Sequence, residues 1–246
     1  MLFRSTFFLA GAGTSSGTIG AVTDSGNGKY YTTLTATTAG TAKNINARLA
    51  TDTVHTTLPT VTVIAGTFSL NNSVLSFSPN PILKYDTSTV TLQVKDGSSN
   101  NITTGGLDVK IEFFGNPRSI SSTIGYLLPV VDNQNGTYSA RMVSFATGAK
   151  NIIASIWNGS SYQDVQSFPS AMTVNARPVS LSLSTVDWGG PDQTTLIVGG
   201  NEYFNLYARN DKGEAYTETN LAVQFTLAAD GTSNGNALEA PHNDGG

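Results

Sequence analysis

The sequence contains no cysteine, which excludes a disulfide framework, a thiolate metal site and a cysteine nucleophile. Histidine occurs only twice, so a Ser-His-Asp arrangement would have to use His55 or His242, which lie at unrelated positions of the chain. Only 13 of the 246 residues are basic and the formal net charge is −4, which argues against nucleic acid or anionic lipid as a partner. We therefore expect no enzyme.

Long apolar runs are also missing, because no stretch approaches the roughly 20 apolar residues needed to span a bilayer. The opening run MLFRSTFFLAGAG has some features of a signal peptide. It also aligns with the strand-like segments LDVKIEFF at 107–114 and LAVQFTLA at 221–228, so we interpret it as a strand. With 39% hydrophobic and 12% charged residues, the chain should fold.

One segment of the chain repeats. DSGNGKYYTTLTATTAGTAKNINA at 24–47 is echoed by DNQNGTYSARMVSFATGAKNIIA at 132–154. Both copies contain the pattern Asp-x-x-Asn-Gly-x-Tyr, 108 residues apart, formed by Asp24, Asn27, Gly28 and Tyr30 and by Asp132, Asn135, Gly136 and Tyr138. Further matches align Phe7-Phe8 with Phe113-Phe114, 18–20 with 123–125, and FFLAGAGTSSG at 7–17 with FTLAADGTSNG at 225–235.

These matches divide the chain into three modules. Residues 1–66 correspond to the back of a first module, 67–176 to a complete module, and 177–246 to the front of a third. Met1 then falls inside a repeat, and we expect the chain to be an excerpt from a longer array.

Apolar and polar residues alternate with a period of two, which predicts half-buried strands. Gly, Asn, Asp and Pro interrupt the alternation about every eight to twelve residues, as in an antiparallel sandwich. The predicted fold is all-β, with tandem immunoglobulin-like β-sandwich modules of about seven antiparallel strands each. The strands expected in the complete module are 73–78, 88–95, 107–114, 122–130, 137–145, 150–157 and 166–175.

The Asn-Gly pairs favour tight hairpin turns, because Asn and Gly adopt positive φ at low cost. Such a turn fixes the strand register and keeps Tyr30 and Tyr138 on one face. We predict that the eight residues of the repeated pattern are structural turn residues rather than catalytic or cofactor-binding ones.

The complete module resembles a known family. VKDGSSNNITTGG and LDVKIEFFG, followed by VDNQNGTYSARMVSFATGAKNIIASI, are similar to the bacterial immunoglobulin-like repeats of the invasin and intimin type. This resemblance implies an extracellular, cell-surface stalk that holds an adhesive tip away from the outer membrane. Its partners would be neighbouring modules of the same chain and an unidentified receptor or glycan. The turn at 96–100 lacks the GNPV that is usual in the family.

Other chemistry has weaker signals. Calcium at module junctions needs several oxygen ligands, which Asp24, Asp132 and Asp211 with their asparagine neighbours could offer, although Asx turns explain them equally well. We expect no cofactor. Lys43 and Lys150 recur at one position of the repeat, which is compatible with an isopeptide bond to Asn or Asp. The simpler and preferred interpretation is that these lysines protect an exposed strand edge. Candidate paired carboxylates do not recur between modules: Glu112, Asp132, Glu202, Glu214 and Glu218.

The leading hypothesis is therefore a structural and adhesive array without catalysis. A carbohydrate-binding module with Trp157, Tyr162 or Trp188 as a stacking platform is an alternative, although burial is the expected fate of these rings. A phage fibre segment is a further alternative. Strand exchange between the two terminal part-modules would give a head-to-tail fibre, but 1–28 and 219–246 share one register, which argues against it.

Overall fold

The computed structural model describes residues 5–115, 119–166, 170–190, 195–218 and 221–226. All regular secondary structure in these ranges is β-strand, as the all-β prediction requires. The chain divides into two compact units, Met1–Val174 and Asn175–Gly246. In the described ranges, no helix has the length and apolar character needed to cross a membrane.

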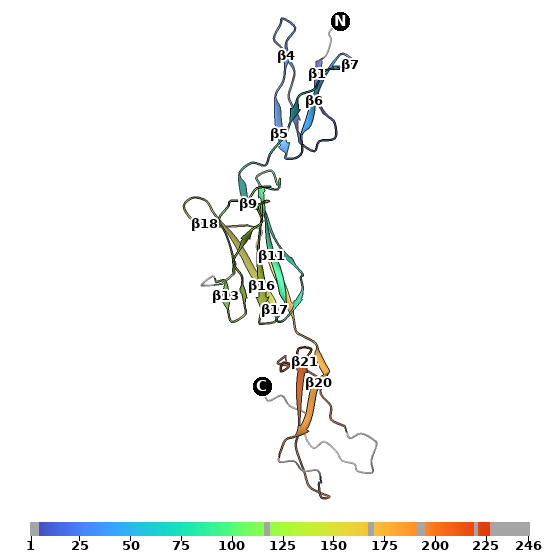
Figure 1. Ribbon diagram of the computed structural model, residues 1–246, viewed down its shortest axis with the longest axis vertical. Coiled ribbons are helices and arrows are strands. Elements are labelled where there is room, and N and C mark those ends of the chain that lie inside the picture. The colour runs from blue at the N-terminus through green and yellow to red at the C-terminus, as the bar shows by residue number, and fades with distance from the viewer. Residues whose placement is uncertain (1–4, 116–118, 167–169, 191–194, 219–220, 227–246) are drawn as a thin grey trace. The chain divides into compact units, whose positions relative to one another are not determined.

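The larger unit contains a two-sheet sandwich between residues 68 and 175, here called the central sandwich (Figure 1). Its first sheet comprises β9 (Phe68–Ser78), β11 (Thr87–Asp96), β16 (Thr137–Ser144), β14 (Gly125–Leu127), β13 (Ser121–Ser122) and β15 (Val131–Asp132). Its second comprises β10 (Ile82–Leu83), β19 (Ser170–Asn175), β17 (Gly148–Trp157), β12 (Val109–Phe113) and β18 (Tyr162–Asp164). The orders β9-β11-β16-β14 and β12-β17-β19 are the ABED and CFG orders of an immunoglobulin-like sandwich.

The core of the sandwich follows the predicted alternation. Along β11, every second side chain is buried, and the three central ones, Val90, Leu92 and Val94, are apolar. Strands β12 and β16 contribute their own alternate residues from the two facing sheets. Core side chains include Val90, Leu92, Val94, Ile111, Phe113, Tyr138, Met142, Ile152, Ile156 and Met172. Burial of this apolar surface is the main source of stability, at about 25 cal/mol per Å².

Strand β9 is longer than predicted and contains a β-bulge. The pairing with β11 shifts between Gln93 and Lys95, which lie opposite Val74 and Ser69. The fully buried Ser73 fills the gap, since its hydroxyl donates to the Ser69 carbonyl (2.7 Å) and accepts the Lys95 amide (3.1 Å). The side chain thereby replaces ladder bonds that the bulge interrupts.

The N-terminal sheets, residues 5–61, repeat the pairings of the central sandwich. Strand β6 (Lys43–Leu49) pairs with β1 (Ser5–Ala10), β7 (Asp52–Thr53) and β8 (Thr60–Val61). Strand β2 (Ser16–Ile19) pairs with β5 (Leu34–Thr38), and β3 (Thr23–Asp24) pairs with β4 (Tyr30–Tyr31). Residues 5–10 of the opening apolar run, which was interpreted as a strand, form β1.

The register of the flanking strands differs from the sequence alignment. Gly17 lies opposite Ala36, as Gly125 lies opposite Ser144, so Gly17 rather than Gly20 corresponds to Gly125. A Cβ at either glycine would lie about 2.5 Å or less from a carbonyl oxygen of the neighbouring strand. Likewise, Phe7 lies opposite Ala47 as Ile111 lies opposite Ala154, so the alignment of Phe7 with Phe113 was wrong by two residues. The Gly20 error came from a chance Thr-Ile-Gly match, because Gly17 keeps the 108-residue offset of the hairpin. The Phe7 error came from a difference in loop length that sequence matching did not place.

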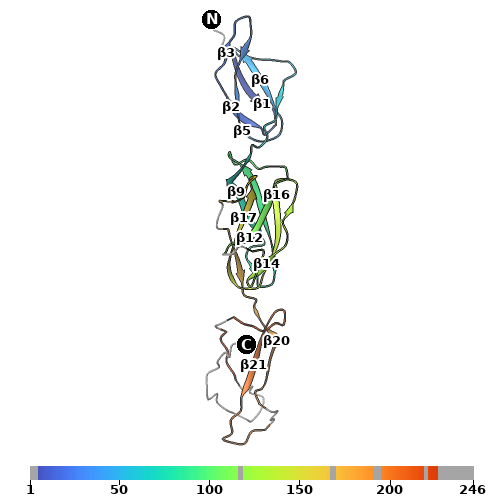
Figure 2. The ribbon, with the colours of Figure 1, turned by 90° about the vertical axis from the view of Figure 1, so that its left-hand side faces the viewer.

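The C-terminal unit contains one hairpin, β20 (Val179–Trp188) and β21 (Phe204–Asn210), in its described residues (Figure 2). Its pairing shifts between Ser180 and Thr185, opposite Arg209 and Tyr207. The Ser184 hydroxyl donates to the Ser180 carbonyl (2.7 Å) and accepts the Arg209 amide (2.9 Å). The hairpin therefore repeats β9 and β11 together with their bulge serine.

Candidate functional site at the polar turns

Each of the two Asp-x-x-Asn-Gly-x-Tyr segments forms a hairpin, and the two hairpins have equivalent strand pairing. Asp24 lies opposite Tyr30, and Asp132 lies opposite Tyr138. In each copy the aspartate Oδ1 accepts the amide two residues on, Gly26 or Gln134, at 2.8 Å. These are Asx turns, which hold the backbone of a three-residue loop.

Asparagine does not play the same part in both hairpins. Asn27 and Gly28 both have positive φ, as predicted for an Asn-Gly turn. In the second hairpin the positive values belong to Gln134 and Gly136, so the expectation for Asn135 was wrong. Asn135 instead accepts hydrogen bonds from the amide and the hydroxyl of Thr137, at 3.0 and 2.7 Å.

In the central sandwich this hairpin also holds a second segment. The Asp132 Oδ2 accepts the Gly106 amide at 2.7 Å, and the Tyr138 hydroxyl accepts the Leu107 amide at 2.9 Å. The Gly136 carbonyl accepts the Val94 amide at 3.0 Å. Burial raises the pKa of Tyr138 above its usual value, so the phenol stays neutral. The hairpin thus fixes the entry to β12.

The turn at 96–100 was not among the predicted site residues, yet it forms a dense network of hydrogen bonds around one carboxylate. The buried Asp96 carboxylate accepts the amides of Gly66, Ser98 and Asn100, each at 2.9 Å, and the Asn100 side-chain amide at 3.0 Å. These hydrogen bonds, that of Gly66 first, lower the pKa of Asp96 to about 2. The carboxylate therefore stays charged at neutral pH.

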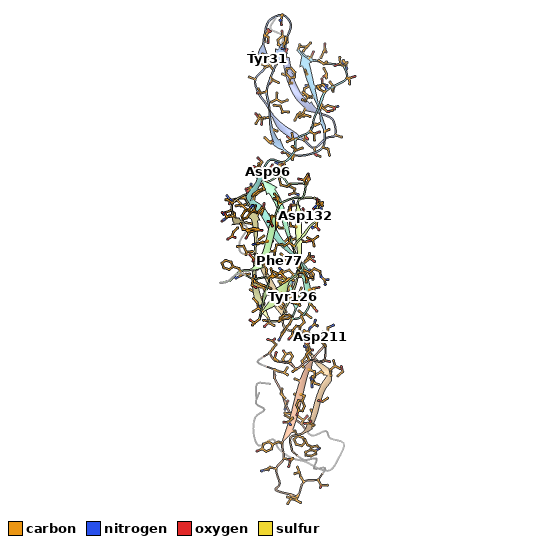
Figure 3. All side chains as sticks on the ribbon, turned by 60° about the vertical axis from the view of Figure 1, so that its left-hand side comes forward. Tyr31, Phe77, Asp96, Tyr126, Asp132 and Asp211 are labelled. Atoms are coloured by element: carbon orange, nitrogen blue, oxygen red, sulfur yellow. The ribbon has the colours of Figure 1, made fainter. Side chains whose placement is uncertain are left out.

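Asn100 extends this network to the N-terminal sheets. Its Oδ1 accepts the Ala39 amide at 3.0 Å, and its Nδ2 donates to the Thr37 carbonyl at 3.4 Å. The connecting segment is held at both ends, because Gly66 donates to Asp96 while the Val63 amide donates to the Ser15 hydroxyl at 3.0 Å. Asp96 and Tyr126 lie toward opposite ends of the central sandwich (Figure 3).

The C-terminal unit has an equivalent turn with the chemical groups exchanged. The Asn210 Oδ1 accepts the amides of Lys212 and Glu214, at 2.9 and 3.1 Å, as the Asp96 carboxylate accepts those of Ser98 and Asn100. Here the amide is at the first position and the carboxylate at the fifth, since Asn210 Nδ2 donates to Glu214 Oε2 at 2.9 Å. An Asp or Asn with a partner four residues on is the sequence signal that would have found both turns.

The neighbouring Asp211 pairs with Arg177, whose guanidinium contacts both carboxylate oxygens at 3.0 and 2.9 Å. Arg177 is buried, and its Nη1 makes both contacts, so this charge-assisted pair fixes the start of β20 against the turn. The three aspartates considered as calcium ligands thus bond to N–H groups. No cluster of three or more metal-ligating side chains occurs within the described ranges.

Lys150 does not protect a strand edge, because β17 lies between β19 and β12 and the side chain is buried. Its Nζ donates to the carbonyls of Thr147 and Gly148 at 2.6 and 3.3 Å. Burial lowers the pKa of Lys150 below its usual value. The amine is thus bonded to backbone carbonyls, which do not provide the side-chain acyl group of an isopeptide bond.

The remaining candidates are dispersed. Glu112 lies on β12, where it pairs with Ile153, whereas Glu202, Glu214 and Glu218 belong to the C-terminal unit. His55 is exposed, and His242 lies outside the described residues. The structure therefore assembles no general-acid pair from the predicted carboxylates of the larger unit, Glu112 and Asp132, which occupy different sheets.

The aromatic candidates lie on different strands. Trp157 was expected to be buried but is exposed, with its ring edge-on to Tyr162 at 5.1 Å between centroids. Lys110 Nζ lies 3.8 Å from the centre of the Tyr162 ring, and the Tyr162 hydroxyl donates to Asp108 at 2.7 Å. This hydrogen bond raises the pKa of Tyr162. Trp188 packs against Phe204 in the C-terminal unit.

Comparison with known proteins gives no family: no family model and no curated protein matches the sequence. Among solved structures, the chain is similar to the Escherichia coli adhesin FdeC, with 23% identity over 87% of this chain and 64% of that chain and a TM-score of 0.49. InvD of Yersinia pseudotuberculosis has 22% identity over 85% and 59%, with a TM-score of 0.42. Invasin, a bacterial integrin-binding protein, has 16% identity over 87% and 40%, with a TM-score of 0.42.

The chain thus spans less than two thirds of the length of each of these solved chains. Similarity at these identities and TM-scores does not establish a shared activity, substrate or partner.

Proposed function

We propose that this chain is a stalk or adhesive segment of a large bacterial extracellular or cell-surface repeat protein and has no catalytic role. It comprises modules at 1–66, 67–176 and 177–246, and the eight residues of the two hairpins serve structure. Its partners are the neighbouring modules and a receptor or glycan, without a resident cofactor.

The observation that carries this proposal is the use made of the repeated polar groups. Asp24 and Asp132, Ser73 and Ser184, and Asp96 and Asn210 stand at equivalent places, and each bonds to backbone amides or carbonyls of its own unit. The hydrogen bonds of these side chains hold turns and bulges in place. The contacts that recur along the chain therefore stabilise the fold of each unit, as expected of an array of structural repeats.

Single-molecule stretching of the chain between two handles tests the stalk role. Unfolding of residues 68–175 should give a discrete force peak and release about 350 Å of contour length, because an extended residue spans about 3.3–3.6 Å. Extension without such a peak would contradict a load-bearing function. The same chain with Phe113→Asp, which puts a charge into the core, is the control that should lack the peak.

The exposed Trp157 favours one second candidate, carbohydrate binding, because its ring lies beside Tyr162, which contacts the polar groups of Asp108 and Lys110. Binding to a glycan array that disappears with Trp157→Ala but survives Trp188→Ala would support it. Trp188 is the matched control because its ring packs against Phe204.

A further inference from the structure

Four Asn-Gly pairs occur in the sequence, at 27–28, 135–136, 158–159 and 234–235. Such a pair can react with itself, because glycine has no Cβ to keep its backbone nitrogen away from the asparagine side chain. The pairs at 135–136 and 158–159 both lie in the central sandwich, so their surroundings can be compared within one sandwich. The pair at 234–235 lies outside the described residues.

The two asparagines of the central sandwich hold their loops in the same way. The Asn158 Oδ1 accepts the amide and the hydroxyl of Ser160, both at 3.0 Å, and the Ser161 amide at 3.0 Å. The Asn135 Oδ1 accepts the amide and the hydroxyl of Thr137, also two residues on. Donors on this oxygen stabilise the negative charge that it gains when a nucleophile attacks Cγ. Both side-chain amides are therefore oriented and polarised for such an attack.

The glycines that would supply the attacking nitrogen differ in their surroundings. Gly136 is buried, and its carbonyl accepts the Val94 amide at 3.0 Å. A Cβ at Gly136 would lie 1.8 Å from the Ile102 carbonyl oxygen. Gly159 is exposed, a Cβ there would meet nothing within 4 Å, and its amide has no hydrogen-bond acceptor among the described residues. Solvent can therefore reach the Gly159 N–H, and its loop has room to rotate, whereas Gly136 is fixed on both sides.

We propose that Asn158 is a site of spontaneous deamidation and that the fold protects Asn135 from the same reaction. Solvent base removes the Gly159 amide proton, and the nitrogen forms a bond to Cγ of Asn158. The bond from Cγ to the side-chain nitrogen breaks, and that nitrogen leaves as ammonia after taking up a proton. Water then opens the resulting succinimide at either of its carbonyls, which gives aspartate or isoaspartate. Water is the only co-reactant.

The reaction changes the loop between β17 and β18. Either product carries a negative charge next to the exposed Trp157 in the chain, and isoaspartate also lengthens the backbone by one methylene. Strand β18 pairs with β17 at three positions, from Ser155–Asp164 to Trp157–Tyr162. The added methylene lies directly after the last of these pairs. We therefore expect isoaspartate to weaken the contact between the Trp157 and Tyr162 rings.

Peptide mapping of the 246-residue chain after incubation at mildly alkaline pH tests the proposal. Trypsin places the two asparagines in separate peptides, 119–141 and 151–209, because the enzyme does not cut between Arg177 and the proline that follows it. In the folded chain, exchange of –NH2 for –OH should be at least about tenfold faster at Asn158 than at Asn135, because Gly136 reacts only after local opening. In urea, which removes the protection by the fold, the two peptides should react at similar rates.

Asn158→Gln is the matched control, because the longer glutamine side chain forms a cyclic imide much more slowly. In this variant, peptide 151–209 should keep its mass. A mass gain in that peptide despite the substitution would assign the reaction to another residue and overturn the proposal. Equal rates at Asn158 and Asn135 in the folded chain, or a reaction at Asn158 only in urea, would overturn it as well. The proposal goes beyond the stalk role and does not depend on it.

Discussion

At the scale of single residues, the same amino acid at a repeated position serves different constraints. Gly28 and Gly136 both have positive φ, at 78° and 80°. A Cβ at Gly28 would meet nothing within 4 Å, whereas a Cβ at Gly136 would lie 1.8 Å from the Ile102 carbonyl oxygen. Backbone conformation therefore explains Gly28, while close packing adds a second requirement at Gly136.

Substitution of these glycines separates the two constraints. Gly28→Ala should cost about 1 kcal/mol, because alanine is strained at positive φ. Gly136→Ala carries that strain and the clash with Ile102, so we expect it to cost about 3 kcal/mol or more. Urea unfolding of both variants measures the difference, and equal losses would contradict the packing argument.

The tyrosines of the two hairpins differ in the same way. Tyr138→Phe removes the hydroxyl that accepts the Leu107 amide, so we expect a loss of about 1 kcal/mol in the free energy of unfolding. Tyr30→Phe should change stability by less than about 0.5 kcal/mol, because Tyr30 is exposed. Thermal unfolding of the two single variants provides the comparison. A larger loss of stability in Tyr30→Phe than in Tyr138→Phe would contradict this explanation.

At the scale of elements, the hairpin with its bulge serine and capped turn is the unit that recurs. The turns at 96–100 and 210–214 have the same backbone bonds, including the amide of the fourth residue to the carbonyl of the first at 3.0 Å in both. Asp96 and Asn100 in one turn are replaced by Asn210 and Glu214 in the other. The turn needs a donor and an acceptor at its first and fifth positions, and the hydrogen bond forms whichever of the two positions carries the donor.

The Asp96 turn should make stability depend on pH in acid. Because hydrogen bonds lower the folded-state pKa of Asp96 from 3.8 to about 2, its stabilising effect is complete above pH 4 and is lost as the pH falls toward 2. Asp96→Asn should reduce stability at pH 7 and flatten this part of the pH profile. Urea midpoints measured between pH 2 and pH 7 test it, and an unchanged slope in the variant would exclude Asp96 as the source.

At the scale of the whole molecule, a few hydrogen bonds determine how the chain passes from the N-terminal sheets to the central sandwich. Val63 is held by Ser15 on one side and Gly66 by Asp96 on the other, while Asn100 bonds to Ala39. Loss of one side-chain amide should therefore loosen this connection without disturbing either core.

Asn100→Ala tests this connection directly. The Ala39 amide loses its acceptor, so we expect its hydrogen exchange to accelerate about tenfold, which corresponds to about 1.4 kcal/mol. Amides of the central core strands should keep their protection. Asn101→Ala is the matched control, because Asn101 is the exposed neighbour of the same type. Unchanged exchange at Ala39 in Asn100→Ala would mean that this hydrogen bond does not hold the segment.

Much of the fold was predictable because its signals are local. Alternation placed Val90, Leu92 and Val94 in the core, and turn chemistry paired Asp132 with Tyr138. The structural role of the eight hairpin residues stays a prediction. Ser73 escaped notice because a serine within a strand gives no sign of a bulge, and Asn100 because its partners at 37–39 lie about 60 residues away in the chain.

The sequence by itself determined the strand class, the repetition and the two hairpin turns, since side-chain alternation and backbone preference act between near neighbours. Only the tertiary structure decided which strands face one another, that Gly17 rather than Gly20 matches Gly125, and which repeated faces are covered. Those outcomes depend on contacts between distant residues. No local pattern encodes them.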